Sequence, residues 1–284
     1  MRLAFLGSPA AAVPFLQALV EAGHHVAVVV SQPDKRRGRG GALMPSPVKA
    51  AALARGIPVT DRAADSKEAG VELGVVVAFG RLVKPDVLER VPMVNVHFSL
   101  LPRWRGAAPV ERAILAGDAE TGVCLMQLEE GLDTGPVYAC ERVAIGDEET
   151  AGELRDRLVD AGVRLMLREL EGGLGAPEPQ AGEPTYAAKL EHDDFRLDWT
   201  RPAVELHRIV RAGPAWTMFR GKRLQVLRAR PTAADVPPGA VEDAVAGTGE
   251  GGLELIEVKP EGKGAMPARA WLNGAHIRSD ERLE

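Results

Sequence analysis

The sequence has few of the features that mark membrane, disulfide-rich and metal-binding proteins. Its two cysteines, Cys124 and Cys140, are too few for a disulfide framework or a CxxC metal site. We expect both to be reduced thiols that pack as small apolar side chains, as is usual in the cytoplasm. No apolar run approaches the ~18 residues of a membrane-spanning helix. The run at 3–6 follows Met1 and Arg2 directly, so we interpret it as a strand and not as a signal peptide.

Several ligand-binding motifs are also missing. The first apolar run ends in Gly7-Ser8-Pro9, which is not the GxGxxG turn of dinucleotide-binding proteins, and no GxxxxGK[ST] motif is present. The chain lacks HExxH, and its six histidines are scattered. We therefore predict no metal and no nucleotide cofactor. Aromatic residues make up 4 % of the chain, which argues against extensive stacking on nucleic-acid bases.

Positive charge is concentrated in two places on an otherwise acidic chain. The formal net charge is −5, yet residues 201–230 contain eight basic side chains and one acid, Glu205. A second basic cluster lies at 35–39. For either cluster alone, a solvated charged surface is the simpler interpretation. An anionic partner is the alternative.

The pattern of apolar runs predicts an α/β fold for the first part of the chain. Five short runs alternate with helix-like segments, as in an open, mostly parallel sheet covered on both faces. The runs are 3–6, 26–30, 73–78, 93–97 and 122–128, and the helices are 10–22, 46–55, 84–91, 108–117 and 148–171. Ser46 followed by Pro47 is typical of a helix start, and Gly56 of a helix end.

The pattern changes beyond about residue 200. A helix at 202–212 precedes short strands at 223–230, 239–245 and 253–258, which are separated by Gly- and Pro-rich turns. Such a series is typical of a small β-barrel. We therefore divide the chain into a first domain at 1–185, a linker at 186–204 and a second domain at 205–284.

The chemically informative residues lie near two strand ends. Asn95 and His97 alternate on a strand that Pro102 cannot continue, so their side chains should share one face of the sheet. Asp133 lies in a loop between Gly131 and Gly135. Ligands of open α/β sheets bind at the carboxyl ends of the strands. Taken singly, the histidine is more simply structural and the aspartate more simply a turn residue.

Together these residues form a recognisable pattern. Asn-x-His-x-Ser-Leu-Leu-Pro at 95–102, with Gly-Leu-Asp-Thr-Gly at 131–135 and Asp133 placed 36 residues after His97, resembles the folate-dependent formyltransferase superfamily. Residues 32–40, 43–49, 100–109 and 117–122 resemble the branch of that superfamily that acts on methionyl-tRNA. The resemblance covers nearly the whole chain and implies a Rossmann-like first domain followed by an OB-like β-barrel.

The resemblance also implies an activity. The chain is expected to transfer a formyl group from 10-formyltetrahydrofolate, a co-substrate, to the α-amino group of methionyl initiator tRNA. Asn95 would donate to the developing oxyanion, His97 would handle the proton, and Asp133 would orient the imidazole. No side chain needs to be acylated, so we expect direct transfer. We also expect the protein to be a cytoplasmic monomer that has no membrane partner.

Binding residues follow from the same resemblance. The expected folate contacts are Ser99, Leu100, Leu101, Pro102, Phe79 and Gly80. The expected tRNA contacts are Lys35, Arg36, Arg37, Arg39, Arg208, Arg211, Lys222 and Arg223. The stretch 35–40 is expected to be a loop that becomes ordered on tRNA. Phe98 departs from the family, which usually has a small residue there; it either narrows the site or packs on the opposite face.

Two other functions remain open from the sequence. One is a different formyl-folate enzyme, acting on glycinamide ribonucleotide or a sugar amine, or hydrolysing formyl-folate, because these enzymes share the Asn/His/Asp set. The other is an RNA-binding protein that has lost catalysis. The extra C-terminal domain disfavours the glycinamide ribonucleotide enzyme, and the intact set of three residues disfavours the loss of catalysis.

Overall fold

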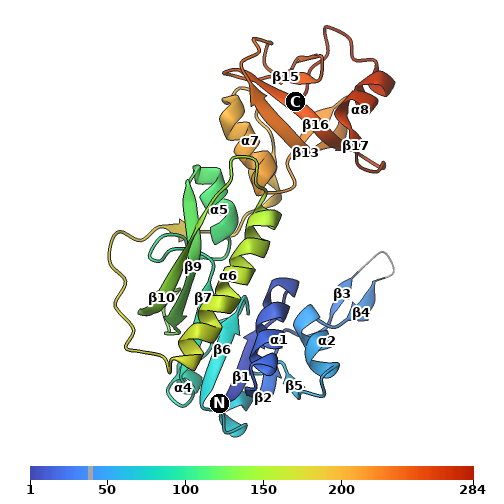
Figure 1. Cartoon of the computed structure of the whole chain (residues 1–284). Coiled ribbons are helices and arrows are strands. Elements are labelled where there is room, and N and C mark those ends of the chain that lie inside the picture. Colours follow the sequence, from blue (N-terminus) through green and yellow to red (C-terminus); the bar gives the residue numbers. More distant parts are fainter. Residues whose placement is uncertain (38–40) are drawn as a thin grey trace. The chain divides into compact units, whose positions relative to one another are not determined.

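A computed structural model describes residues 1–37 and 41–284 (Figure 1). The chain divides into two compact units. The first comprises Met1–Pro109, Glu120–Ala144 and Arg155–Ala188, and the second Val110–Ala119, Ile145–Leu154 and Lys189–Glu284. Within the described residues, no helix has the length and apolar character needed to cross a membrane.

The first unit is built on a seven-stranded sheet of order β10-β9-β7-β6-β1-β2-β5. The strands are β1 (Arg2–Gly7), β2 (His25–Val30), β5 (Val59–Thr60), β6 (Leu73–Val77), β7 (Met93–His97), β9 (Glu120–Gln127) and β10 (Val137–Ala144). The five from β7 to β5 are parallel, and β9 and β10 add an antiparallel edge. This confirms the predicted α/β class with a mostly parallel sheet.

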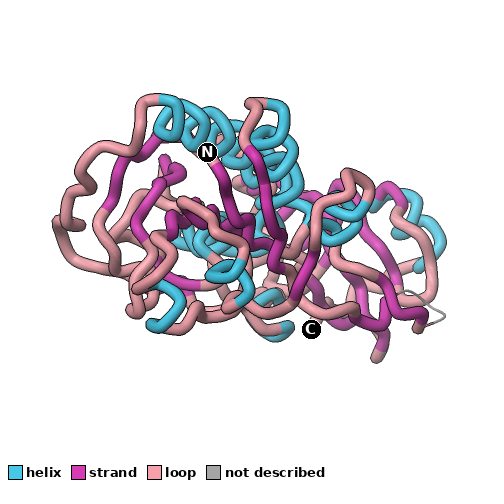
Figure 2. The backbone as a smooth tube through the Cα atoms, turned by 90° about the horizontal axis from the view of Figure 1, so that it is seen from below, coloured by secondary structure: helices cyan, strands magenta, loops and turns pink. Residues whose placement is uncertain are grey.

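Helices cover both faces of the sheet, whose strands are magenta in Figure 2. The unit contains η1 (Ala10–Ala12), α1 (Val13–Glu21), α2 (Pro47–Leu53), α3 (Asp65–Glu68) and α4 (Pro85–Leu88), and α6 (Ala151–Glu171) runs into it. On one face, Gly162 of α6 lets the helix approach Phe15 of α1 and Val123 of β9. On the other face, Leu6 belongs to the same core cluster as Val87 of α4. Because both faces are covered, the strands are continuous apolar runs.

Local signals in the sequence located most of these elements. Ser46 caps α2 as predicted, since its Oγ accepts a hydrogen bond from the Lys49 amide at 3.0 Å. Gly56 follows that helix with a φ of +68°, which favours glycine. Helix α4 is shorter than the predicted 84–91, and α3 and β10 were not predicted.

The prediction of two reduced cysteines is wrong for this structure. Strands β9 and β10 are antiparallel neighbours whose register places Cys140 opposite Cys124. The two residues form a disulfide with a Cα–Cα distance of 4.1 Å. Cysteine count and spacing carried no sign of this pairing, because it depends on a strand that the sequence pattern did not predict.

A short hairpin occupies part of the predicted basic loop. Strand β3 (Lys35–Arg37) pairs with β4 (Ala42–Met44), so Lys35 and Arg36 lie on a strand and not in a loop. Arg39, also predicted to contact tRNA, lies outside the described residues. Strands β8 (Arg105–Gly106) and β11 (Tyr186–Ala187) form a separate two-stranded pair in the same unit.

The second unit contains an antiparallel sheet of order β12-β13-β16-β15-β14, with β17 also paired to β16. Its strands are β12 (Trp216–Phe219), β13 (Lys222–Thr232), β14 (Val241–Glu242), β15 (Val245–Gly247), β16 (Gly252–Pro260) and β17 (Met266–Pro267). It also holds η2 (His192–Phe195), α7 (Ala203–Ala212), α8 (Ala268–Ala275) and most of α5 (Pro109–Ala116). The strand predicted at 239–245 is instead the hairpin β14–β15, and β12, β17 and α8 were not predicted.

Candidate active site

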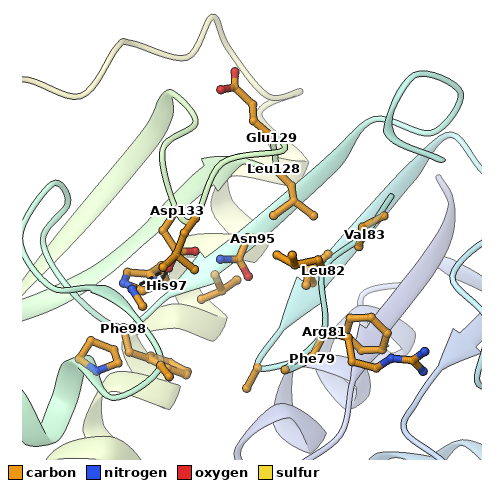
Figure 3. Close-up of a pocket in the computed structure, with 18 of the residues that line it drawn as sticks. Phe79, Arg81, Leu82, Val83, Asn95, His97, Phe98, Leu128, Glu129 and Asp133 are labelled. Carbon is orange, nitrogen blue, oxygen red and sulfur yellow. Dashed lines mark hydrogen bonds and ion pairs between the residues drawn. The ribbon is translucent and has the colours of Figure 1, made fainter. Parts of the chain in front are cut away.

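A cavity of about 500 Å³ lies at the carboxyl ends of β6 and β7, within the first unit (Figure 3). Four stretches line it, drawn from 76–83, 95–98, 106–109 and 128–133. Parallel α/β sheets bind their ligands at this edge, because the loops that follow the strands diverge there. The sequence placed Asn95 and His97 at this edge, whereas Asp133 comes from the loop after β9, which runs antiparallel to β7.

Asn95 and His97 enter the cavity from the same face of β7. Both are buried and both line it, as the two-residue period of the strand predicted. Neighbouring strands fix their positions, since Asn95 is paired with Val76 on β6 and with Met126 on β9. Within the described chain no hydrogen bond joins the Asn95 side chain to protein. Its amide is therefore free to bind a ligand.

The protein engages both ring nitrogens of His97. Nε2 lies 2.9 Å from the carbonyl oxygen of Trp104, which can only accept, so Nε2 carries the hydrogen. Nδ1 lies 3.6 Å from Oδ2 of Asp133, an ion-pair distance when the ring is charged. The imidazole is therefore fixed in orientation, and an imidazolium would face an acceptor at each nitrogen.

Asp133 reaches this position from a strained turn. Its φ of +50° is uncommon for a residue with a side chain. Its Oδ2 also accepts a hydrogen bond from the Gly106 amide at 2.9 Å, and the side chain is 12 % exposed. Gly135 follows so close to the Gln127 carbonyl that no side chain fits there. The predicted glycine-bracketed loop thus presents one carboxylate to one imidazole.

The predicted folate contacts divide into two groups. Phe79 and Gly80 line the cavity. Ser99, Leu100, Leu101 and Pro102 do not line it, so their contact with the folate stays a prediction. Ser99 is fully buried and its Oγ donates to the Arg103 carbonyl at 2.6 Å, while Leu100 packs on Gly122. These residues shape the turn that leads to the Trp104 carbonyl.

Phe98 satisfies both interpretations that the sequence left open. It lines the cavity, and its ring centroid lies 6.2 Å from that of Phe15 on α1. The aromatic side chain therefore narrows the cavity while its ring packs against a helix.

Sequence reasoning missed the apolar rim. Leu82 is 79 % exposed and Leu132 53 % exposed, and both line the cavity together with Val83 and Leu128. Exposed apolar side chains grouped at a cavity are typical of a ligand-binding groove. Leu82 lies in the loop after β6. This position after a strand was the one feature of the sequence that could have indicated a cavity residue.

The basic residues predicted to contact tRNA have varied surroundings. In the hairpin, Lys35 donates to Gln32 Oε1 at 2.7 Å and Arg36 to the Gly41 carbonyl at 3.3 Å, and Arg37 belongs to β3. In the second unit, Lys222 and Arg223 line a cavity of about 330 Å³. The Arg223 guanidinium lies 4.6 Å from the centre of the Trp216 ring.

On α7, Arg208 and Arg211 contact neighbouring backbone, whereas Arg223 on β13 lines a cavity. The guanidinium of Arg208 lies against Gly117. Arg211 is half-buried and donates to the carbonyls of Glu149 and Gly146 at 2.8 and 2.7 Å. Burial lowers the pKa of its guanidinium from the ordinary value of arginine. Arg211 therefore serves the loop before α6, which argues against its predicted role as a phosphate contact.

Comparison with known families decides the class of the chain. The formyl transferase family model matches residues 1–170, and the model of the formyl transferase C-terminal domain matches 189–276. The chain belongs to the formyl transferase family. The cavity with Asn95, His97 and Asp133 thus lies within the first match, and Lys222 and Arg223 lie within the match to the C-terminal domain.

Relatives within the family match over full length. The chain is 46 % identical to a methionyl-tRNA formyltransferase of Parvibaculum lavamentivorans, with all of both chains covered. It is 45 % identical to the methionyl-tRNA formyltransferase of Symbiobacterium thermophilum, covering 100 % of this chain and 95 % of that protein.

More distant solved structures share the fold. HypX from Aquifex aeolicus, in complex with tetrahydrofolic acid, has a TM-score of 0.69 at 19 % identity over 100 % of this chain and 51 % of its own. A methionyl-tRNA formyltransferase from Clostridium thermocellum has a TM-score of 0.62 at 16 % identity over 81 % of this chain and 93 % of its own.

Proposed function

We propose that this formyltransferase moves the formyl group of 10-formyltetrahydrofolate to the α-amino group of methionyl initiator tRNA. The observation that carries the proposal is the convergence of Asn95, His97 and Asp133 on one cavity, in a chain related over its full length to enzymes of that name. The protein would work in the cytoplasm as a monomer.

Direct transfer fits the groups present. The amine nitrogen attacks the formyl carbon, the carbonyl becomes tetrahedral, and its oxygen gains negative charge. The Asn95 amide donates to that oxygen, and positive charge on the His97 ring stabilises the oxyanion electrostatically. The bond from the formyl carbon to N10 of the folate then breaks. One proton leaves the attacking amine and one reaches N10, with His97 as the group that moves it.

Asp133 supports this step through His97. Its carboxylate faces Nδ1 and stabilises positive charge on the ring as the transition state forms. An α-amino group has an ordinary pKa of about 7.7–8.0, so a useful fraction is unprotonated near neutral pH. No covalent intermediate on the protein is required.

The cavity suits the flat ring of a folate. Its volume of about 500 Å³ lies within the range of small-molecule sites. Phe79, Val83 and Leu128 line it with apolar side chains, and backbone groups between 78 and 83 would bond to the polar edge of the ring. Leu82 and Leu132 lie exposed at the cavity, where the linker between the pterin and the glutamate tail would leave it.

The basic residues would bind the phosphates of tRNA. We propose Lys35, Arg36 and Arg37 on β3, Arg39 of the same basic cluster in the sequence, and Arg208, Lys222 and Arg223 in the second unit. Phosphate contacts of this kind make affinity fall steeply with salt. We also propose that 1–185 carries catalysis, that 186–204 is the linker and that 205–284 binds tRNA.

The choice of acceptor separates this proposal from its alternatives. Formyl transfer from 10-formyltetrahydrofolate is measured with methionyl initiator tRNA, methionyl elongator tRNA, free methionine and an amino-sugar nucleotide. The proposal predicts rapid formylation of the initiator alone. Formylation of the sugar amine instead would contradict it, and RNA binding without turnover would support a protein that has lost catalysis.

A further inference from the structure

Gln180 joins the two loops that flank His97. It lies in the Gly- and Pro-rich stretch after α6, where the sequence predicts only a connection. Its Oε1 accepts from Nε and Nη2 of Arg105 at 3.1 and 2.7 Å. Its Nε2 donates to the carbonyls of Asp133 and Gly135 at 2.9 and 2.8 Å. One side chain thus ties the loop of Asp133 to the loop of Trp104 and Gly106.

The chemistry of its partners fixes the orientation of this amide. A guanidinium can only donate and a carbonyl can only accept, so the amide oxygen must face Arg105 and the nitrogen must face the two carbonyls. Both N–H groups and both lone pairs of Gln180 are used. No other side chain of this length offers two donors on one atom and an acceptor on the other.

The consequence for Asp133 is direct. Its backbone has the unfavourable φ of +50°, and Gln180 holds the carbonyl of that same residue. Its carboxylate accepts from the Gly106 amide, and Arg105, the residue before, is held by the same glutamine. Gln180 therefore fixes Asp133, which faces Nδ1 of His97. It also fixes β8, whose Gly106 amide donates to the Asp133 carboxylate.

The rest of the segment is anchored on either side of Gln180. Glu178 pairs with Val137 through two backbone hydrogen bonds of 2.8 Å. Thr185 Oγ1 accepts from the Trp104 amide at 2.9 Å, and β11 pairs with β8. The glutamine is thus presented on a chain that is itself held in place.

We propose that Gln180 is a positioning residue for formyl transfer, which acts by holding the Asp133 carboxylate against His97. This rests on the proposed function of the Asn95, His97 and Asp133 set. A displacement of about 1 Å in such a group lowers turnover by up to about 10²-fold. Because Gln180 does not line the cavity, its loss should lower kcat and leave the KM for the folate donor nearly unchanged.

Two variants separate the two ends of the glutamine. Gln180→Leu removes all four hydrogen bonds, and we expect kcat to fall about 10- to 100-fold with donor KM within about threefold. Gln180→Glu keeps the acceptor for Arg105 but sets a carboxylate against two carbonyls, so it should be at least as slow. The control is Glu183→Ala, an exposed residue of the same segment, which should match the wild type.

A double-mutant cycle tests whether Gln180 acts through Asp133. In an Asp133→Ala background, Gln180→Leu should lower kcat by less than about threefold, because the group that it positions is gone. Equal losses in both backgrounds would overturn the proposal. So would Gln180→Leu and Gln180→Glu variants that fold normally and turn over at the wild-type rate.

An assay-independent readout distinguishes this inference from the proposed function. The imidazole NMR signals of His97, assigned by their loss in His97→Gln, should shift in Gln180→Leu and stay in Glu183→Ala. If the wild type fails to formylate methionyl-tRNA, the proposed function fails while this readout still tests the positioning. Unshifted His97 signals in Gln180→Leu would overturn the positioning role.

Discussion

The carboxylate of Asp133 lies 3.6 Å from Nδ1 of His97, while the other ring nitrogen bonds to a backbone carbonyl. The imidazole therefore has one charged partner and one neutral partner, and the charged one arrives on a loop from a distant part of the sequence. This asymmetry means that replacing the carboxylate should change the chemistry of the ring without releasing it from the site.

Asp133→Asn removes the charge and preserves the size of the side chain. We expect kcat for formyl transfer to fall about 10²-fold, because positive charge on His97 is no longer stabilised in the transition state. The folate KM should change little. Steady-state kinetics measure both, and Asp156→Asn on the exposed face of α6 is the control. Wild-type kcat in Asp133→Asn would show that the carboxylate has no part in transfer.

The disulfide gives a prediction on stability. Cys124 and Cys140 are 16 residues apart, and closing a loop of that size stabilises by about 3 kcal/mol. A reductant should therefore lower the urea midpoint of the wild type. Neither cysteine lines the cavity, so turnover should remain within about twofold of the oxidised value.

Cys140→Ser provides the matched control for the disulfide. Its unfolding curve should resemble that of the reduced wild type and should not respond to reductant. A wild-type midpoint that is the same with and without reductant would contradict a stabilising disulfide.

The start of α6 gives a pH dependence. Hydrogen bonds from the backbone and side chain of Thr150, then from Arg228, lower the pKa of Glu153 from 4.5 to about 2. A lowered carboxyl pKa adds stability that is complete above pH 4.5 and is lost as the pH falls toward about 2. Glu153→Gln should therefore lose less stability across that window than the wild type.

Urea midpoints measured across the window check the role of Glu153. Glu183→Gln, at an exposed site, should keep the wild-type pH dependence. Parallel curves for wild type and Glu153→Gln would show that the interaction does not stabilise the fold.

Basic residues on β13 and on α7 should respond differently to salt when they are replaced. Lys222→Ala should weaken tRNA binding and reduce the slope of log affinity against log salt by about 0.9, the loss of one phosphate contact. Arg211→Ala should instead lower thermal stability and leave the slope unchanged, because its donors bind the carbonyls of Gly146 and Glu149. Binding titrations at several salt concentrations measure both, and an unchanged slope for Lys222→Ala would remove it from the proposed surface.

Strand alternation and helix capping in the sequence predicted those features that depend on residues close together in the chain. The alternation of a strand placed Asn95 and His97 on one face, and the cap residue Ser46 marked the start of α2. Both features depend on neighbours within a few residues, and this is the range that periodicity and capping rules describe.

Contacts between distant segments could not be predicted in this way. Gln180 is 47 residues from Asp133, and it lies in a stretch whose composition indicates only a loop. The pairing of Cys124 with Cys140 needs β10, whose mixed polarity reflects its edge position and hides the strand period. The position of the Ser99 side chain also depends on the turn that follows β7. In that turn the Ser99 hydroxyl, which we expected to contact the folate, is buried and donates to the Arg103 carbonyl.

Catalysis at this cavity is tested most directly by single-turnover formyl transfer to methionyl initiator tRNA by His97→Ala, measured beside its affinity for the folate donor. Donor affinity should stay near that of the wild type, and transfer should be slower by about 10²- to 10⁴-fold, because the group that moves the proton is lost. Transfer by His97→Ala at the wild-type rate would contradict the assignment of this cavity as the catalytic site.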